Sequence, residues 1–264
     1  MINLIHGDCL DVMAGMEPDT FDVVVTSPPY NMGIDYGLYD DDMEESVYLL
    51  WLRQVAEQIH RVTTRGASFF LNIGYNPTDP TFPFRVINHL ECPWKVQNVI
   101  HWIKAISIDG KGSWGHYKPV NSRRFLNQTH EYIFHLTKTG EVPVDRLALG
   151  VPYQDTSNAK RWASAEGRNV RCRGNCWFIP YKTITSRDKD RPHPATFPPL
   201  LAEWCIRLHK GSSNVLDPFV GIGSTMLAAE KLGLRGVGID VDAGYLKVAE
   251  GRVTKLRQGI DTTG

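Results

Sequence analysis

The chain has 264 residues, 42% of them hydrophobic, and its 29 Lys and Arg balance its 29 Asp and Glu. This composition is typical of a globular protein and excludes a disordered or fibrous chain. No apolar run reaches the roughly 18 residues of a membrane span and no signal-like N-terminal stretch is present, so we expect a cytoplasmic protein without membrane contact.

Strands and helices are predicted to alternate at both ends of the chain. In chain order, the apolar patterns predict strands at 2–5, 21–25, 67–73, 96–103, 131–137, 215–217 and 236–240, and helices at 9–15, 43–63, 199–209, 226–232 and 243–257. Such alternation is typical of an α/β sheet with helices on both faces. Residues 139–192 are irregular and too long for a connection inside a compact core, which leaves a separate lobe, a functional insertion or a disordered tract.

Near the C-terminal end, a predicted strand is followed by a turn, a helix and a second strand. The turn contains Gly221 and Gly223, and glycines are used where a ligand approaches the backbone closely. The helix after this turn offers free N–H groups to a ligand. Asp217 precedes the turn, and Asp240 ends the next strand, where a carboxylate can accept hydrogen bonds from both ribose hydroxyls. Met226 breaks the full pyrophosphate fingerprint, so the pattern indicates either a nucleotide cofactor site or a tight packing turn.

The tetrapeptide Ser27-Pro28-Pro29-Tyr30 follows a predicted buried strand. Its two prolines stiffen the loop and remove two N–H donors, so Pro28 offers only a carbonyl oxygen. Ser27 can accept through its hydroxyl oxygen, and the two acceptors together can bind both hydrogens of an exocyclic amine. Tyr30 offers a ring face for a planar base. Acceptors outside the base plane would favour a pyramidal nitrogen whose lone pair can attack an electrophile; the alternative is a proline-rich turn without chemistry.

Two segments carry a resemblance to a known family. Residues 26–30 (Thr-Ser-Pro-Pro-Tyr) and 217–225 (Asp-Pro-Phe-Val-Gly-Ile-Gly-Ser-Thr) are similar to the amine and cofactor motifs of S-adenosylmethionine-dependent DNA amino-methyltransferases. Their order, with the amine motif first, resembles the permuted β-class. Three further segments look like parts of that class: Gly7-Asp8, residues 129–132 (Thr-His-Glu-Tyr) and residues 193–198 (His-Pro-Ala-Thr-Phe-Pro).

The resemblance implies an α/β, Rossmann-like fold with a seven-stranded, mostly parallel sheet, one antiparallel strand and helices on both faces. It implies S-adenosylmethionine as the cofactor. We expect no metal, because the spacing of Cys172 and Cys176 lacks a second pair of ligands. The residues that would hold the target base for catalysis are Ser27, Pro28, Pro29 and Tyr30. The implied cofactor-binding residues are Asp8 near the adenine, Thr196 and Phe197 against the methionine end, and Asp217, Phe219, Gly221, Gly223, Thr225 and Asp240.

The middle of the chain differs in charge from its N-terminal part. Residues 1–103 carry 5 Lys and Arg against 14 Asp and Glu, whereas residues 104–191 carry 16 against 8. A basic region in a neutral protein predicts contact with a polyanion, although an ordinary solvated surface can have the same charge. The resemblance implies that residues 139–192 form a target-recognition region, inserted between two parts of one methyltransferase domain, residues 1–138 and 193–264.

The predicted reaction is direct methyl transfer to the exocyclic amine of a flipped base in double-stranded DNA. No Pro-Cys dipeptide occurs, so the 5-methylcytosine route is disfavoured, and we interpret the five cysteines as structural. Ser27 favours cytosine N4, because in the family serine is commoner there with cytosine and aspartate with adenine N6. Adenine N6, a non-catalytic DNA-binding protein, and an RNA or protein amine methyltransferase are the alternatives. A partner restriction endonuclease, and the choice between monomer and homodimer, stay open.

Overall fold

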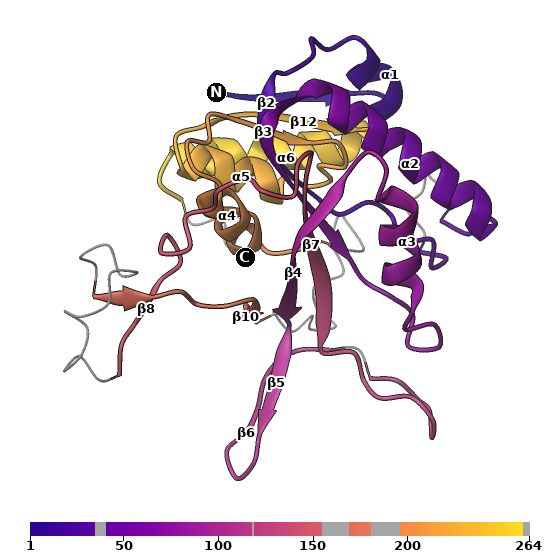
Figure 1. Cartoon of the computed structure of the whole chain (residues 1–264), viewed down its shortest axis with the longest axis vertical. Coiled ribbons are helices and arrows are strands. Elements are labelled where there is room, and N and C mark those ends of the chain that lie inside the picture. Colours follow the sequence, from indigo (N-terminus) through magenta and orange to yellow (C-terminus); the bar gives the residue numbers. More distant parts are fainter. Residues whose placement is uncertain (35–40, 118, 155–168, 181–195, 261–264) are drawn as a thin grey trace.

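The computed structural model describes residues 1–34, 41–117, 119–154, 169–180 and 196–260 (Figure 1). Within these residues the main sheet has eight strands in the order β1-β12-β11-β2-β3-β7-β4-β10. The strands are β1 (Ile2–His6), β2 (Phe21–Thr26), β3 (Thr63–Ile73), β4 (Lys95–Ile103), β7 (His130–Thr137), β10 (Cys176–Phe178), β11 (Asn214–Asp217) and β12 (Arg235–Asp240).

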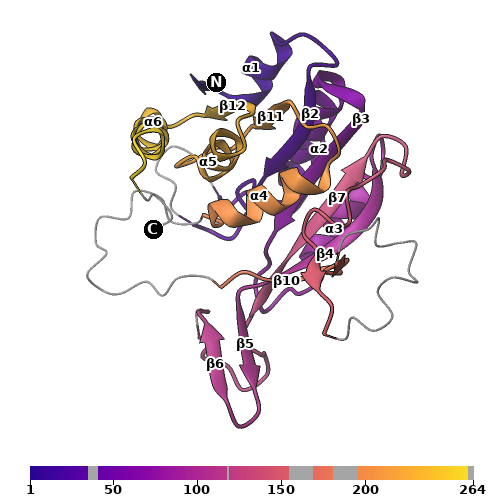
Figure 2. The same cartoon turned by 90° about the vertical axis from the view of Figure 1, so that its left-hand side faces the viewer.

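Helices cover both faces of this sheet (Figure 2). One face packs against α1 (Cys9–Ala14), α2 (Glu45–Val62) and α3 (Phe82–Leu90), and the other against α4 (Pro199–Leu208), α5 (Ser224–Lys231) and α6 (Ala243–Arg257). Helix α2 begins where the Glu44 carboxylate accepts hydrogen bonds from the N–H groups of Ser46 and Val47. Its buried side chains recur at helical spacing, which places one apolar face against the sheet.

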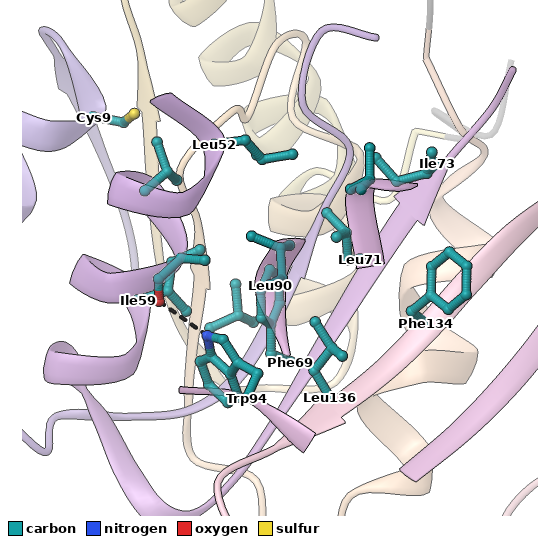
Figure 3. Close-up of a cluster of buried hydrophobic side chains, with 14 of the residues drawn as sticks. Cys9, Leu52, Ile59, Phe69, Leu71, Ile73, Leu90, Trp94, Phe134 and Leu136 are labelled. Carbon is teal, nitrogen blue, oxygen red and sulfur yellow. Dashed lines mark hydrogen bonds between the residues drawn. The ribbon is translucent and has the colours of Figure 1, made fainter. Parts of the chain in front are cut away.

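Figure 3 shows the buried cluster under α2 and α3. Trp94 is fully buried there, and its Nε1 donates to the carbonyl of Ala56 in α2 at 2.9 Å. The rings of Phe69 in β3 and Trp94 meet edge to face, with 5.2 Å between their centroids. Full burial of a large apolar side chain contributes about 1.5–3 kcal/mol, so contacts of this kind fix α2 on the sheet.

The two ends of the chain interleave in one sheet. Strands β12 and β11, from the C-terminal part, lie between β1 and β2, from the N-terminal part. Ile2 of β1 pairs with Gly236 of β12, and Val23 of β2 pairs with Val215 of β11. The carboxyl ends of these parallel strands therefore lie at one edge, where Ser27 and Gly221 line the same cavity.

The predicted fold class is confirmed, with one strand more than the seven expected. Only β7, among the described strands of this sheet, runs antiparallel to its neighbours β3 and β4. The additional strand is β10, which pairs in parallel with β4 and comes from the segment that the sequence marks as irregular. It has three residues, too few for a periodic pattern, and it is held by a hydrogen bond from Trp102 Nε1 to the Ile179 carbonyl at 2.8 Å. This part of residues 139–192 thus belongs to the main sheet rather than to a separate lobe.

Besides β10, three features of the described residues were not predicted. Helix α3 starts at Phe82-Pro83, directly after a proline-rich turn that hides its short apolar pattern. The second is a hairpin of β5 (Ala105–Ile108) and β6 (Gly112–Gly115), which projects away from the sheet (Figures 1 and 2). A smaller pair is formed by β8 (Val151–Pro152) and β9 (Val170–Arg171). In the part of the chain that the structure describes, no helix is long and apolar enough to cross a membrane.

Candidate active site

A cavity of about 520 Å³ opens at the carboxyl ends of the central strands. It lies beside β11 and β2, where the order of the parallel strands reverses, and such a switch point is the usual ligand site of an open α/β sheet. Its volume falls in the roughly 300–1,000 Å³ range of small-molecule sites. The predicted site residues that line it are Asp8, Ser27, Pro28, Pro29, Tyr30, Thr196, Phe197, Asp217, Phe219, Gly221 and Asp240.

Asp240 is held firmly at one end of this cavity. Its Oδ2 accepts from the N–H of Gly221 at 2.8 Å, and its Oδ1 accepts from the N–H of Asp242 at 2.9 Å. Burial raises the pKa of Asp240 above its ordinary value, against these two hydrogen bonds. Each carboxylate oxygen can accept a further hydrogen bond, so both remain able to bind ribose hydroxyls.

Asp217 stabilises the turn that contains Gly221 and Gly223. Its carboxylate accepts from the Thr26 hydroxyl at 2.6 Å and from the N–H of Phe219 at 3.1 Å. Burial raises the pKa of Asp217 to about 6. It therefore links β2, which carries the amine motif, to the turn that follows β11.

Asp8 begins α1 and also borders the cavity. Its Oδ1 accepts from the N–H of Leu10 at 2.7 Å, which is an ordinary helix N-cap. Trp51 of α2 and Phe219 lie on the same side of the cavity with their ring centroids 5.5 Å apart. These rings provide apolar surface for a planar group, and sequence reasoning missed Trp51 because it stands in an ordinary amphipathic helix.

The lining suits S-adenosylmethionine, which combines a net positive charge with an adenine ring and a ribose. The described lining residues include four Asp but only one Lys, and this Lys104 forms an ion pair with Glu131. The aspartates are Asp8, Asp217, Asp240 and Asp242. Carboxylates attract a sulfonium and an ammonium, and the apolar rings accommodate the adenine.

Two expected cofactor residues do not line the cavity. Gly223 has a φ of 86° at the start of α5, and a Cβ there would lie 2.8 Å from the Cβ of Ala249 in α6. Thr225 is fully buried and donates to the Val25 carbonyl at 3.2 Å. Both residues hold α5 close to its neighbours, and their part in cofactor binding stays a prediction.

The Ser-Pro-Pro-Tyr loop forms another part of the cavity wall. The carbonyl of Pro29 accepts from the Tyr48 hydroxyl at 2.8 Å, which fastens the loop to α2. The Ser27 Oγ lies 2.6 Å from the Tyr30 hydroxyl oxygen. Tyr30 is only 8% exposed, so much of its ring already packs against protein and the remainder faces the cavity.

A buried polar cluster behind Tyr30 was missed by sequence reasoning. The Tyr30 hydroxyl donates to Glu131 Oε2 at 3.1 Å, and Asn72 Nδ2 donates to both Tyr30 and Glu131 at 2.7 Å. Lys104 Nζ lies 2.8 Å from Glu131 Oε1. Burial favours a higher pKa for Glu131, but the Lys104 ammonium and the hydrogen bonds from Asn72 and Tyr30 together lower this pKa.

Thr196 and Phe197 close the cavity from the segment before α4, and Phe197 is buried. The neighbouring residues 193–195 lie outside the described residues. His116, Tyr117 and Pro119, beyond the β5–β6 hairpin, line the cavity as well. No sequence motif marks these three residues. They line the cavity because the chain returns to it after the hairpin.

Comparisons with known proteins agree with this geometry. The model of a family described as DNA methylase, with the name N6_N4_Mtase, matches residues 21–251. The type II methyltransferase M.ScaI of Streptomyces caespitosus is 29% identical over 266 residues, covering 97% of this chain and 83% of the relative.

Two solved structures have a similar fold. The cytosine-N4-specific PvuII DNA methyltransferase has a TM-score of 0.70 at 18% identity, over 97% of this chain and 91% of that one. The TTHA0409 DNA modification methylase of Thermus thermophilus, complexed with S-adenosyl-L-methionine, has a TM-score of 0.64 at 22% identity over the full length of both chains. The family match spans most of the sequence, and the chain therefore belongs to the N6/N4 DNA methylase family.

Proposed function

We propose that this protein transfers a methyl group from S-adenosylmethionine to the exocyclic amine of a flipped base in double-stranded DNA. The observation that carries the proposal is one cavity lined by both motifs, the Ser27–Tyr30 loop on one wall and the Asp240–Gly221 pair on another. S-adenosylmethionine supplies an electrophilic methyl group on a positively charged sulfur. Alignment of the two reactants in a preformed cavity is the main contribution expected of the protein.

The proposed roles follow from position in the cavity. Ser27 and the carbonyl of Pro28 accept the two N–H bonds of the amine, while Pro29 keeps the loop rigid through Tyr48. Tyr30 packs against the base. On the cofactor side, Asp240 accepts from the ribose, and the remaining lining residues surround the adenine and methionine groups: Asp8, Thr196, Phe197, Asp217, Phe219 and Gly221.

Cytosine N4 is the proposed target, with adenine N6 as the alternative. Ser27 in the first position of the amine motif supports cytosine, and the PvuII enzyme of similar fold is named as cytosine-N4-specific. Both bases present an amine with two N–H groups, so the acceptors of the loop suit either one.

Two surfaces are proposed to contact the DNA. The first comprises residues 104–129, named here the hairpin arm. Lys104, His116, Tyr117 and Pro119 of this arm line the cavity, and the arm carries the exposed Lys111, Arg123 and Arg124. Leu126 on this arm is 90% exposed. The second is the proposed target-recognition region, residues 139–192, placed between the catalytic parts 1–138 and 193–264. Positive charge on a segment that also reaches the cavity suits contact with the DNA backbone around the flipped base.

The test is to express the chain in cells that lack other amino-methyltransferases and to identify modified bases in their DNA by mass spectrometry. We expect N4-methylcytosine, and sequencing of single molecules would give the recognition site. A matched strain expressing Ser27→Ala, which removes the acceptor, is the control and should contain much less of the product. Detection of N6-methyladenine instead would make adenine N6 the target. The absence of both modified bases would overturn the proposed function.

A further inference from the structure

The hydrogen-bond chain behind the amine loop has a fixed direction. A tyrosine hydroxyl has one proton, and Glu131, when ionised, has none to give. The Tyr30 proton must therefore point at Glu131 Oε2, 3.1 Å away, because otherwise an oxygen lone pair would face a carboxylate. The Tyr30 oxygen is then an acceptor, so the Ser27 hydroxyl at 2.6 Å is the donor.

Two neighbours keep Glu131 ionised and the chain in place. Lys104 pairs with Oε1 of Glu131 at 2.8 Å, and both side chains are largely shielded from solvent. Asn72 directs its amide N–H₂ at Glu131 and Tyr30, since the reverse orientation would set its carbonyl oxygen against the carboxylate. The Oδ1 of Asn72 is buried without a hydrogen-bond partner among the described residues. This orientation of the amide costs free energy, and the hydrogen bonds that its N–H₂ group donates to Glu131 and Tyr30 offset that cost.

Gly74 provides the room for this arrangement. A Cβ at Gly74 would lie 2.7 Å from Cε2 of Tyr30 and 3.4 Å from Cδ of Glu131. Glycine at this position lets the phenol ring lie close to the backbone just after β3, within hydrogen-bond distance of both Ser27 and Glu131.

We infer that Glu131 is a positioning residue that orients the Ser27 hydroxyl through Tyr30. With its proton directed at Tyr30, Ser27 presents only lone pairs to the cavity and is set to accept from the amine of the target base. An unconstrained serine could instead donate its proton to a ring nitrogen or to the amine lone pair, which would block attack. This inference rests on the proposed function and adds a role for three residues to it: Glu131, Lys104 and Tyr30 through its hydroxyl.

The first experiment compares Glu131→Gln and Tyr30→Phe with the wild type under single-turnover conditions with cofactor-saturated protein. We expect each variant to lower the methyl-transfer rate at saturating DNA at least tenfold, while the dissociation constant for S-adenosylmethionine stays within twofold. The double variant should lose no more than the worse single variant, because both changes break one chain. Glu57→Gln, which removes an exposed ion pair with Arg53 on α2, is the matched control and should keep the wild-type rate.

The second experiment uses pH and separates orientation from simple support of the fold. In Lys104→Met, burial is no longer opposed by the ammonium, so the pKa of Glu131 rises. Its protonated form becomes more populated as pH falls; this form is an uncharged, weaker acceptor and also has a proton to donate, so it no longer fixes the direction of the Tyr30 hydroxyl. The rate should therefore rise with pH in Lys104→Met, depend less on pH in the wild type, and lose this rise in Lys104→Met/Glu131→Gln.

A wild-type rate in Glu131→Gln would overturn the inference, and so would identical pH profiles for Lys104→Met and the wild type. If Glu131→Gln does not fold, the Lys104→Met profile decides alone. A wild-type protein that methylates no DNA would overturn the proposed function instead, so the two failures are distinguishable.

Discussion

At the scale of single residues, the two walls of the cavity are organised around buried carboxylates with different tasks. Asp240 and Asp217 bind backbone N–H groups and thereby shape the glycine turn. Glu131 binds side chains and stabilises the amine loop. A carboxylate in each of these places is costly to bury, and the hydrogen bonds around it offset that cost.

Asp240→Asn is expected to weaken cofactor binding. The amide keeps one acceptor oxygen, but its NH₂ group would face one of the two backbone N–H groups that Asp240 now accepts from. Loss of hydrogen bonds to a charged acceptor costs about 1.5–3 kcal/mol, or roughly 10- to 100-fold in affinity. Isothermal titration with S-adenosylmethionine measures the change. Asp11→Asn, an exposed change on α1, is the control. Equal affinities for the two variants would contradict the proposed contact between Asp240 and the ribose.

At the scale of elements, a polar chain of side chains joins neighbouring strands of the main sheet. His135 of β7 lies between the Ser68 hydroxyl of β3 and the Asn98 amide of β4, each 2.9 Å away. Ser68 also meets His209, after α4, at 2.9 Å. The chain links the antiparallel strand to both neighbours through side chains as well as through the backbone.

This chain should make the fold sensitive to acid. Burial lowers the pKa of His135 to about 4, from 6.5 in an unfolded chain. Between these values the unfolded state binds the proton and the folded state does not, so stability falls as pH falls. The expected loss in the free energy of unfolding is about 2 kcal/mol at pH 5 relative to pH 7.5. Urea unfolding at several pH values measures it.

The control for this pH effect is His135→Gln, which cannot titrate. It should be less stable at neutral pH but lose less stability on acidification than the wild type. Because the fold also lowers the pKa of His209 and raises that of Asp217, the difference between the two proteins is the informative quantity. Parallel pH curves would show that His135 does not set the slope.

The hairpin arm makes a separate prediction about DNA binding. Arg123 and Arg124 are both exposed on it. Each phosphate contact changes the slope of log affinity against log salt by about 0.9, so Arg123→Ala/Arg124→Ala should reduce the slope by roughly 2. Fluorescence anisotropy with duplex DNA at several salt concentrations measures this slope. Lys247→Ala/Lys255→Ala on α6 removes the same charge elsewhere, and an equal change in both variants would contradict a specific role for the arm.

At the scale of the whole molecule, sequence reasoning succeeded where the information is local. The Ser27–Tyr30 loop and the Gly221 turn are contiguous motifs with a chemical meaning, and both line the cavity. Asn72 and Glu131 come together only because β3 and β7 pair antiparallel, with Asn72 opposite Ile133. No spacing along the chain reveals such a pairing. The strand β10 is too short for a periodic pattern, and a proline-rich turn obscured the start of α3.

The interleaving of the two chain ends makes the fold and the cofactor site depend on each other. Strands β1 and β2 flank β12 and β11, and the cavity draws its walls from all four. Thermal unfolding should therefore show one transition for the methyltransferase core. At 100 times its dissociation constant a ligand adds about 2.7 kcal/mol, which corresponds to a rise of roughly 5–10 °C for a chain of this size. Calorimetry with S-adenosylmethionine measures it, and Asp240→Asn at the same concentration should show a smaller rise. Two transitions, only one of them shifted by the cofactor, would mean that the two ends fold independently.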